Sequence, residues 1–251
     1  MPQRHVHFLK QSVSCVESSE PEMTESEPMS SSVPRYLFDP KEKPSRPLHD
    51  VPVVAATDVS VQPFGYLVDD PDSVDVEIVQ WPAQGWRPID EDSGDEGGCV
   101  EGVFHGRWQG DVLYGSNEAV KGHYVLGWSV DSQSASCDEP TVSRKQVLLW
   151  HMNYHPDGGQ LFYPLEKTPF VFPVAEPGDD LDPSRVIALW CDGNRGLYIH
   201  PNVWHEGVFP VADTQRFLDR QGRVHARVSC DFGDEFGLYL RVPLGLSRDS
   251  L

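Results

Sequence analysis

The segment that decides the fold runs from Lys145 to Leu165 and reads KQVLLWHMNYHPDGGQLFYPL. Apolar runs flank a PDGG sequence whose Pro, Asp and Gly residues favour a turn, so two neighbouring strands are predicted. Side chains of a strand alternate between its two sides. One side of the first strand then carries Val147, Leu149, His151, Asn153 and His155, and the other carries Leu148, Trp150, Met152 and Tyr154. The first side changes from aliphatic to polar, which is typical of a barrel wall that is packed at one end and holds a polar site at the other.

Similar short apolar runs lie before and after this segment, separated by Gly, Pro, Asp and Asn. They are GVFHGRWQG (102–110), HYVLGWSV (123–130), PFVFPVAE (169–176), RVIALWC (185–191), GLYIHP (196–201), ARVSCDF (226–232) and FGLYLRVPL (236–244). No long stretch shows the 3.6-residue period of a helix. The pattern predicts an all-β protein with an antiparallel barrel or sandwich.

The N-terminal part of the chain has a different composition. Residues 12–47 are dominated by Ser, Glu and Pro and hold few aromatic residues. Such a segment buries too little apolar surface to offset the entropy of ordering it. We therefore predict a disordered acidic tail over residues 1–47 and one β-barrel domain over residues 48–251. A phosphorylated or partner-binding arm is the alternative interpretation of the tail.

Charge and cysteine content limit the function classes. The chain has 39 acidic and 20 basic residues among its 251, a formal net charge of -19. Such a charge repels nucleic-acid phosphates and anionic membranes, so neither is an expected partner. No apolar run approaches the ~20 residues that span a bilayer. The five cysteines are scattered and odd in number, which favours a reduced, cytoplasmic setting.

A second polar segment, GNRGLYIHPNVWHEG (193–207), places His200 before a turn and His205 after it. Together with His155, Gln160 and Asn153, these side chains could form one polar cluster. Neutral imidazoles bind divalent transition metals, and amide oxygens are weaker ligands. The alternative is that each histidine is an ordinary hydrogen-bonded residue of the core or the surface.

The order H-P-x-G-x-Q-x-F-x-P in HPDGGQLFYPL (155–165), followed by Gly193, Gly196 and NVWH (202–205), resembles the ureidoglycolate lyase family of the cupin superfamily. The resemblance covers about residues 150–211. It implies a cupin-type double-stranded β-helix, usually a homodimer, with a small-molecule substrate. It also implies a cytoplasmic carbon–nitrogen lyase of allantoin and purine breakdown, which cleaves ureidoglycolate to glyoxylate and urea and is associated with a divalent transition metal.

Carried over to this sequence, the resemblance implies that His155, Gln160 and His205 are the catalytic residues and the metal ligands. Asn153 stands where an acidic residue is expected, and Tyr154 where the family often has Arg. Loss of the carboxylate weakens a metal site, and loss of the Arg removes a bidentate partner for a substrate carboxylate. His151, on the same strand side as Asn153, could replace the missing ligand. The predicted substrate-binding residues are His151, Asn153, Tyr154, Arg195 and His200.

Several points stay open at this level. His155 or His205 would act as the base, or both would be ligands of a metal that polarises the substrate hydroxyl. Arg195 or Arg107 would supply the cation for the substrate carboxylate. The stretch between Cys99 and Trp150 is longer than the family needs and is either a surface insertion or a change to the pocket mouth. The alternatives for function are a cupin enzyme of different chemistry, such as an isomerase or another small hydroxy-acid lyase, and a non-catalytic small-molecule-binding cupin.

Overall fold

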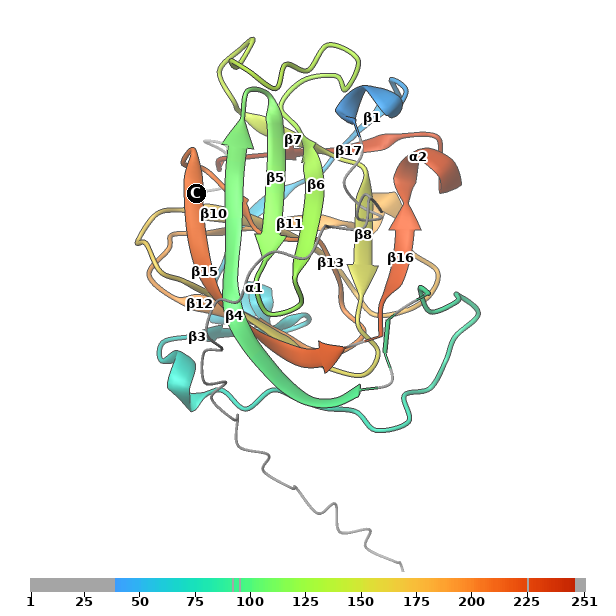
Figure 1. Ribbon diagram of the computed structural model, residues 1–251, viewed down its shortest axis with the longest axis vertical. Helices are drawn as coiled ribbons and strands as arrows, with labels where there is room; N and C mark the ends of the chain where they lie inside the picture. The colour runs from blue at the N-terminus through green and yellow to red at the C-terminus, as the bar shows by residue number, and fades with distance from the viewer. Residues whose placement is uncertain (1–38, 92, 95, 225, 247–251) are drawn as a thin grey trace, which may run out of the picture.

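The computed structural model describes residues 39–246 except 92, 95 and 225 (Figure 1). Nearly all regular structure in this range is β-strand, and the two α-helices in it span only four residues each, α1 (Asp58–Val61) and α2 (Phe232–Glu235). The prediction of an all-β fold is confirmed. The predicted disorder of residues 1–38 concerns a part of the chain outside the described residues.

The strands form two sheets. One has ten strands in the order β1 (Leu48–Asp50), β17 (Tyr239–Pro243), β7 (Gln146–Leu149), β6 (Gly122–Trp128), β5 (Val112–Asn117), β4 (Glu96–Gln109), β15 (Thr214–Val224), β9 (Gln160–Pro164), β12 (Gly196–Ile199) and β3 (Gly65–Val68). The other has seven, in the order β16 (Val228–Asp231), β8 (His151–Tyr154), β13 (Trp204–His205), β10 (Phe170–Ala175), β11 (Ile187–Cys191) and β2 (Val53–Ala55), with β14 (Phe209–Pro210) beside β10. Most pairs are antiparallel; β1 with β17 and β2 with β11 are parallel.

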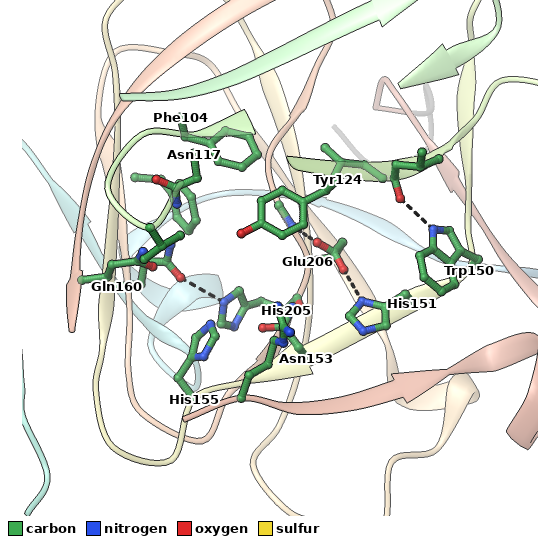
Figure 2. A pocket seen from close by; sticks show the side chains of 17 residues that line it. Phe104, Asn117, Tyr124, Trp150, His151, Asn153, His155, Gln160, His205 and Glu206 are labelled. Carbon is green, nitrogen blue, oxygen red and sulfur yellow. Dashed lines mark hydrogen bonds and ion pairs between the residues drawn. The ribbon is translucent and has the colours of Figure 1, made fainter. Parts of the chain in front are cut away.

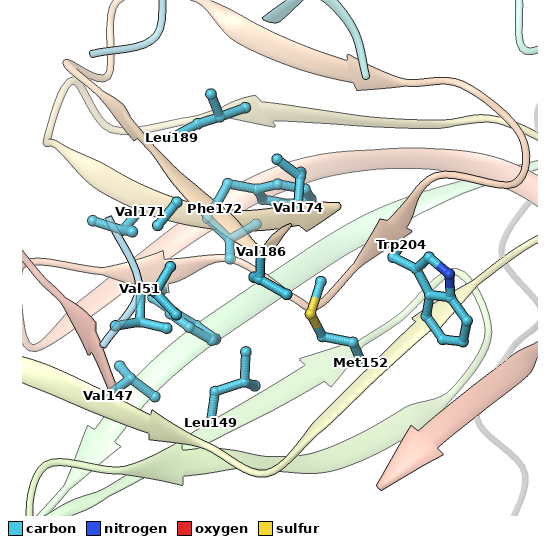
Figure 3. Packing of buried hydrophobic residues seen from close by; sticks show 14 of the residues in the cluster. Val51, Val147, Leu149, Met152, Val171, Phe172, Val174, Val186, Leu189 and Trp204 are labelled. Atoms are coloured by element: carbon cyan, nitrogen blue, oxygen red, sulfur yellow. The ribbon is translucent and has the colours of Figure 1, made fainter. Parts of the chain in front are cut away.

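The two sheets pack face to face through aromatic side chains. Phe162 of β9 lies with its ring centroid 5.3 Å from that of Phe172 on β10, and Phe217 of β15 lies 5.0 Å from Phe170. All four side chains are at most 2% exposed. Figure 3 shows aliphatic side chains of the same core, with Met152 near Trp204. This apolar packing holds the walls together and leaves the polar side chains to gather at one end.

The predicted strand through residues 145–155 is in fact two strands in different sheets. Strand β7 pairs with β17 and β6 in the ten-stranded sheet, whereas β8 pairs with β16 and β13 in the seven-stranded sheet. The chain passes from the ten-stranded to the seven-stranded sheet at Trp150, whose buried indole N–H donates to the Val125 carbonyl at 2.8 Å. The chain thus links the two walls directly beside the polar segment.

Ordered contacts begin before residue 48, where the barrel domain was expected to start. The Tyr239 hydroxyl donates to the Pro44 carbonyl at 3.0 Å. Lys43 forms an ion pair with Asp231, and its ammonium lies 4.3 Å from the centroid of the Trp150 ring. Residues 43 and 44 are therefore attached to the β-sheet domain. No helix among the described residues is long and apolar enough to cross a membrane.

Candidate functional site

A polar pocket lies between the two sheets (Figure 2). The seven-stranded sheet and the loops beside it contribute His151, Asn153, His155, His205, Glu206 and Arg227. The ten-stranded sheet contributes Phe104, Asn117, Tyr124, Gln160, Phe162 and Gln221. Five predicted site residues thus meet in one place: His151, Asn153, His155, Gln160 and His205.

The two central imidazoles are each fixed by a backbone carbonyl. Nδ1 of His155 lies 3.0 Å from the carbonyl oxygen of Ala226, and Nδ1 of His205 lies 2.8 Å from that of Val203. A carbonyl oxygen only accepts, so Nδ1 carries the proton and Nε2 carries the lone pair of each neutral ring. The ring centroids are 5.2 Å apart. Burial lowers the pKa of His205, which keeps this ring neutral near pH 7.

A buried carboxyl group orients the Gln160 side chain. Nε2 of Gln160 donates to Oδ1 of Asp219 at 2.7 Å, and Nδ2 of Asn117 donates to Oδ2 of Asp219 at 2.8 Å. These bonds turn Oε1 of Gln160 toward Nε2 of His205, at 3.3 Å. Strand register explains the grouping, because Asp219 and Phe162 are paired across β15 and β9 and so share one side of the sheet with Gln160.

Asp219 is fully buried. Burial raises its pKa to about 7, although the hydrogen bonds from Gln160 and Asn117 act in the opposite direction. A carboxyl group with this pKa changes its charge near neutral pH, in direct contact with the residue that faces His205.

The contact between Gln160 and His205 brings two hydrogen-bond acceptors together. Nε2 of neutral His205 and Oε1 of Gln160 both offer lone pairs, and such atoms repel unless a proton or a cation lies between them. His155 presents a third acceptor nearby, and Figure 2 shows its ring beside that of His205. Among the described residues, no group of three or more His, Cys, Asp and Glu side chains could hold a metal. The side chains that could hold a metal here are two imidazoles and one amide oxygen, all of them neutral ligands.

A histidine–carboxylate pair forms the other part of the pocket. Nδ1 of His151 lies 2.7 Å from Oε2 of Glu206, and Oε1 of Glu206 accepts from the Gly207 backbone N–H at 2.8 Å. Asn153 lies on the same strand and donates to the His205 carbonyl at 3.3 Å. Glu206 thus brings a carboxylate into a pocket where position 153 supplies none.

Three predicted substrate-binding residues do not line this pocket. Tyr154 is on the opposite side of β8, as strand alternation requires, and its hydroxyl donates to Oδ1 of Asp179 at 2.6 Å. Arg195 lies in the turn before β12, with its guanidinium 2.9 Å from Asp58. His200 follows β12 and pairs with Glu77 at 2.7 Å on the surface.

The cation in the pocket wall is a different arginine from the two predicted. Arg107 lies on the outer side of β4, where its guanidinium bonds Gln109 at 3.1 Å, and it is absent from the pocket lining, as is Arg195. Among the described residues that line the pocket, Arg227, just before β16, is the one with a basic Lys or Arg side chain. Its Nε lies 2.9 Å from Asp90. Arg227 follows Ala226, whose carbonyl accepts from Nδ1 of His155.

Sequence reasoning missed Asn117, Glu206, Asp219, Gln221 and Arg227. One signal was available in TQRFLDRQ (214–221), because alternation puts Phe217, Asp219 and Gln221 on one side of a strand. A carboxylate and an amide in line with a core phenylalanine indicate a polar patch in the interior. For Asn117, the stretch between Cys99 and Trp150 proves to be part of the ten-stranded sheet, where β5 and β6 bring Asn117 and Tyr124 to the pocket.

Comparison with known proteins finds similarity in the part of the chain that holds most of the pocket residues. Residues 128–231 match the model of the ureidoglycolate lyase family, and this range holds His155, Gln160, His205 and Asp219. The segment therefore resembles a ureidoglycolate lyase domain. Ureidoglycolate lyase of Azotobacter vinelandii is 38% identical over 94 residues, which are 36% of this chain and 55% of the relative. That of Stutzerimonas stutzeri is 40% identical over 78 residues, 30% of this chain and 46% of the relative. The chain thus spans about half the length of these relatives, and Asn117 and Tyr124 come from outside the matched ureidoglycolate lyase segment.

Proposed function

We propose that this protein is a ureidoglycolate lyase that releases glyoxylate and urea. The observation that carries the proposal is the meeting of His155, Gln160 and His205 in one buried pocket between the sheets, within the segment that matches the family. The three residues come from different strands or loops, so their convergence is a property of the fold.

The reaction sets clear demands on such a pocket. The substrate hydroxyl loses its proton as its oxygen forms the aldehyde carbonyl of glyoxylate, the C–N bond breaks, and the urea nitrogen gains a proton. Atoms balance without added water. A base, a proton donor and a cationic partner for the carboxylate are needed.

The imidazoles supply the proton acceptor. Nε2 of His155 and of His205 carries the lone pair, since each Nδ1 donates to a carbonyl. With no metal bound, the base would be His155, because the lowered pKa of His205 makes His205 a weak base. With a metal bound, the Nε2 lone pair of His155 would be a metal ligand and could not also accept the proton. We assign the proton donor for the urea nitrogen to His151, whose ring lies in the pocket with Nδ1 2.7 Å from the Glu206 carboxylate.

A divalent transition metal is part of the proposal, with His155, Gln160 and His205 as its ligands. When bound, it would polarise the substrate hydroxyl and lower that group's pKa. The supporting observation is the pair of facing acceptors at Gln160 and His205, 3.3 Å apart. Asp219 would then act behind the site, where its hydrogen bond keeps the amide oxygen of Gln160 turned toward His205.

Arg227 is our choice for the residue that binds the substrate carboxylate. Both arginines are paired with a carboxylate, Arg227 with Asp90 and Arg195 with Asp58, but Arg227 lines the pocket and Arg195 does not. A guanidinium can bind a carboxylate through two parallel hydrogen bonds.

The direct test is to measure glyoxylate and urea from ureidoglycolate with the purified protein, with and without a chelator and added divalent metal. Equal amounts of the two products are expected, with loss of activity in the chelator. Stabilisation by ureidoglycolate without turnover would instead indicate a binding protein. The cytoplasmic location and the homodimer stay predictions, and light scattering on the full chain tests the second.

A further inference from the structure

Gln221 has a buried donor that the protein itself does not use. Its side chain is 1% exposed and lines the pocket, on the same side of the sheet as Gln160, with which it is paired across β15 and β9. Within the described part of the chain, its Nε2 has no hydrogen-bond partner. A buried amide N–H without a partner is unfavourable, so its presence in a pocket points to a ligand that completes it.

The other amide side chains of the pocket donate hydrogen bonds to groups of the protein. Asn117 and Gln160 both donate to Asp219, and Asn153 donates to the His205 carbonyl. Gln221 is therefore the pocket amide whose Nε2 is available to a ligand.

The surroundings indicate which part of a ligand would lie here. Asp219 is two residues away on the same side of β15, and its carboxyl disfavours an anionic group at this wall. Arg227 lies at the other sheet and suits a carboxylate. A neutral carbonyl oxygen suits the N–H group of Gln221.

We propose that Gln221 determines substrate specificity by donating its Nε2–H to the carbonyl oxygen of the ureido group. The inference rests on the proposed function and adds the orientation of the substrate: its ureido end faces β15 and its carboxylate faces Arg227.

Two probes that share a carboxylate and differ in the ureido group test this. Oxalurate carries a ureido group, and oxamate ends in a simple amide. In the full-length protein, Gln221→Met keeps the length of the side chain and removes the donor. Calorimetric titration should show oxalurate binding weakened about tenfold or more, which is the effect of losing one good hydrogen bond in a buried site, and oxamate binding changed less than twofold. KM for ureidoglycolate should rise in the same variant.

Gln215 provides the matched control. It lies on the same strand and is also 1% exposed, but its Nε2 donates to the Thr168 carbonyl at 2.8 Å. Gln215→Met should lower the melting temperature and leave both dissociation constants unchanged. Gln221→Leu is a second variant of Gln221, for use if the methionine variant does not fold, and it should also weaken oxalurate binding more than oxamate binding.

The results separate this inference from the function itself. Suppose that the wild type turns over ureidoglycolate. If Gln221→Met then binds oxalurate as tightly as the wild type, or if its affinity for oxalurate and oxamate falls equally, the role of Gln221 is overturned and the lyase function stands. If the wild type neither turns over ureidoglycolate nor binds oxalurate, both proposals fall.

Discussion

Nε2 of His205 lies 3.3 Å from Oε1 of Gln160, and both atoms are acceptors when the imidazole is neutral. Neither side chain is free to correct this contact. Val203 holds the proton of His205 on the other ring nitrogen, and Asp219 holds the amide nitrogen of Gln160. A proton or a cation between the two atoms would relieve their repulsion.

Replacing either central histidine should remove activity and leave the fold intact. His155→Ala and His205→Ala each delete a lone pair that the reaction needs, and a fall in kcat of roughly 10²–10⁴-fold is expected. Glyoxylate release is the measurement, with circular dichroism as the check on folding. His200→Ala is the control, since His200 pairs with Glu77 outside the pocket and should keep full activity. Full activity in both pocket variants would remove the assigned site.

Metal content should follow the same residues. The wild type, purified without chelator, is expected to hold about one divalent metal per chain by elemental analysis, and His155→Ala and Gln160→Leu should hold much less. Gln160→Glu should bind the metal more tightly, because a carboxylate replaces a neutral oxygen. Metal content that is equally low in the wild type and all variants would argue for metal-free chemistry.

Asp219 should give the protein a recognisable dependence of stability on pH. Its pKa is about 7 in the folded state and near 3.8 when exposed, so between these values the folded protein binds more protons than the unfolded chain. Its contribution is fully present below pH 4 and is lost as pH rises to about 7, with a slope of up to ~1.4 kcal/mol per pH unit.

Asp219→Asn removes this titration. The free energy of unfolding of the wild type, minus that of the variant, should fall from pH 4 to pH 7 and be flat above, as measured by urea denaturation. A difference that does not change with pH would show that Asp219 ionises normally.

Tyr154 should matter for stability and not for substrate binding. Its hydroxyl bonds Asp179 on the side of β8 away from the pocket, and its ring meets the edge of Trp204 with centroids 4.7 Å apart. Tyr154→Phe keeps the ring and removes the bond to a charged group, which should cost about 1–3 kcal/mol of unfolding free energy. KM for ureidoglycolate should be unchanged, and a large increase in KM would restore Tyr154 to the site.

The fold and part of the site could be predicted because both follow from local rules. Alternation along one strand put His151, Asn153 and His155 on one side, and the PDGG turn returned the chain so that Gln160 came close. The same alternation put Tyr154 on the far side. The prediction that Tyr154 binds substrate came from its position in the family motif, and strand alternation describes its placement better.

The rest depends on pairing between distant strands. Nothing near Gln160 in the sequence indicates Asp219, which reaches it only because β15 and β9 are neighbours in a particular register. Glu206 follows His205 directly and would point away in a regular strand, but β13 ends at His205, so the rule no longer applies to the next residue. The switch of sheet at Trp150 leaves no mark in the apolar pattern.

That switch of sheet also bears on how a ligand enters. Strands β7 and β8 are consecutive and belong to opposite walls, so the walls are covalently joined at the rim of the pocket. The two sheets cannot separate at this rim without breaking the backbone hydrogen bonds of β7 or β8. The Trp150 side of the pocket is therefore set before a ligand binds, and little of the binding free energy should be lost to reorganising the backbone on that side.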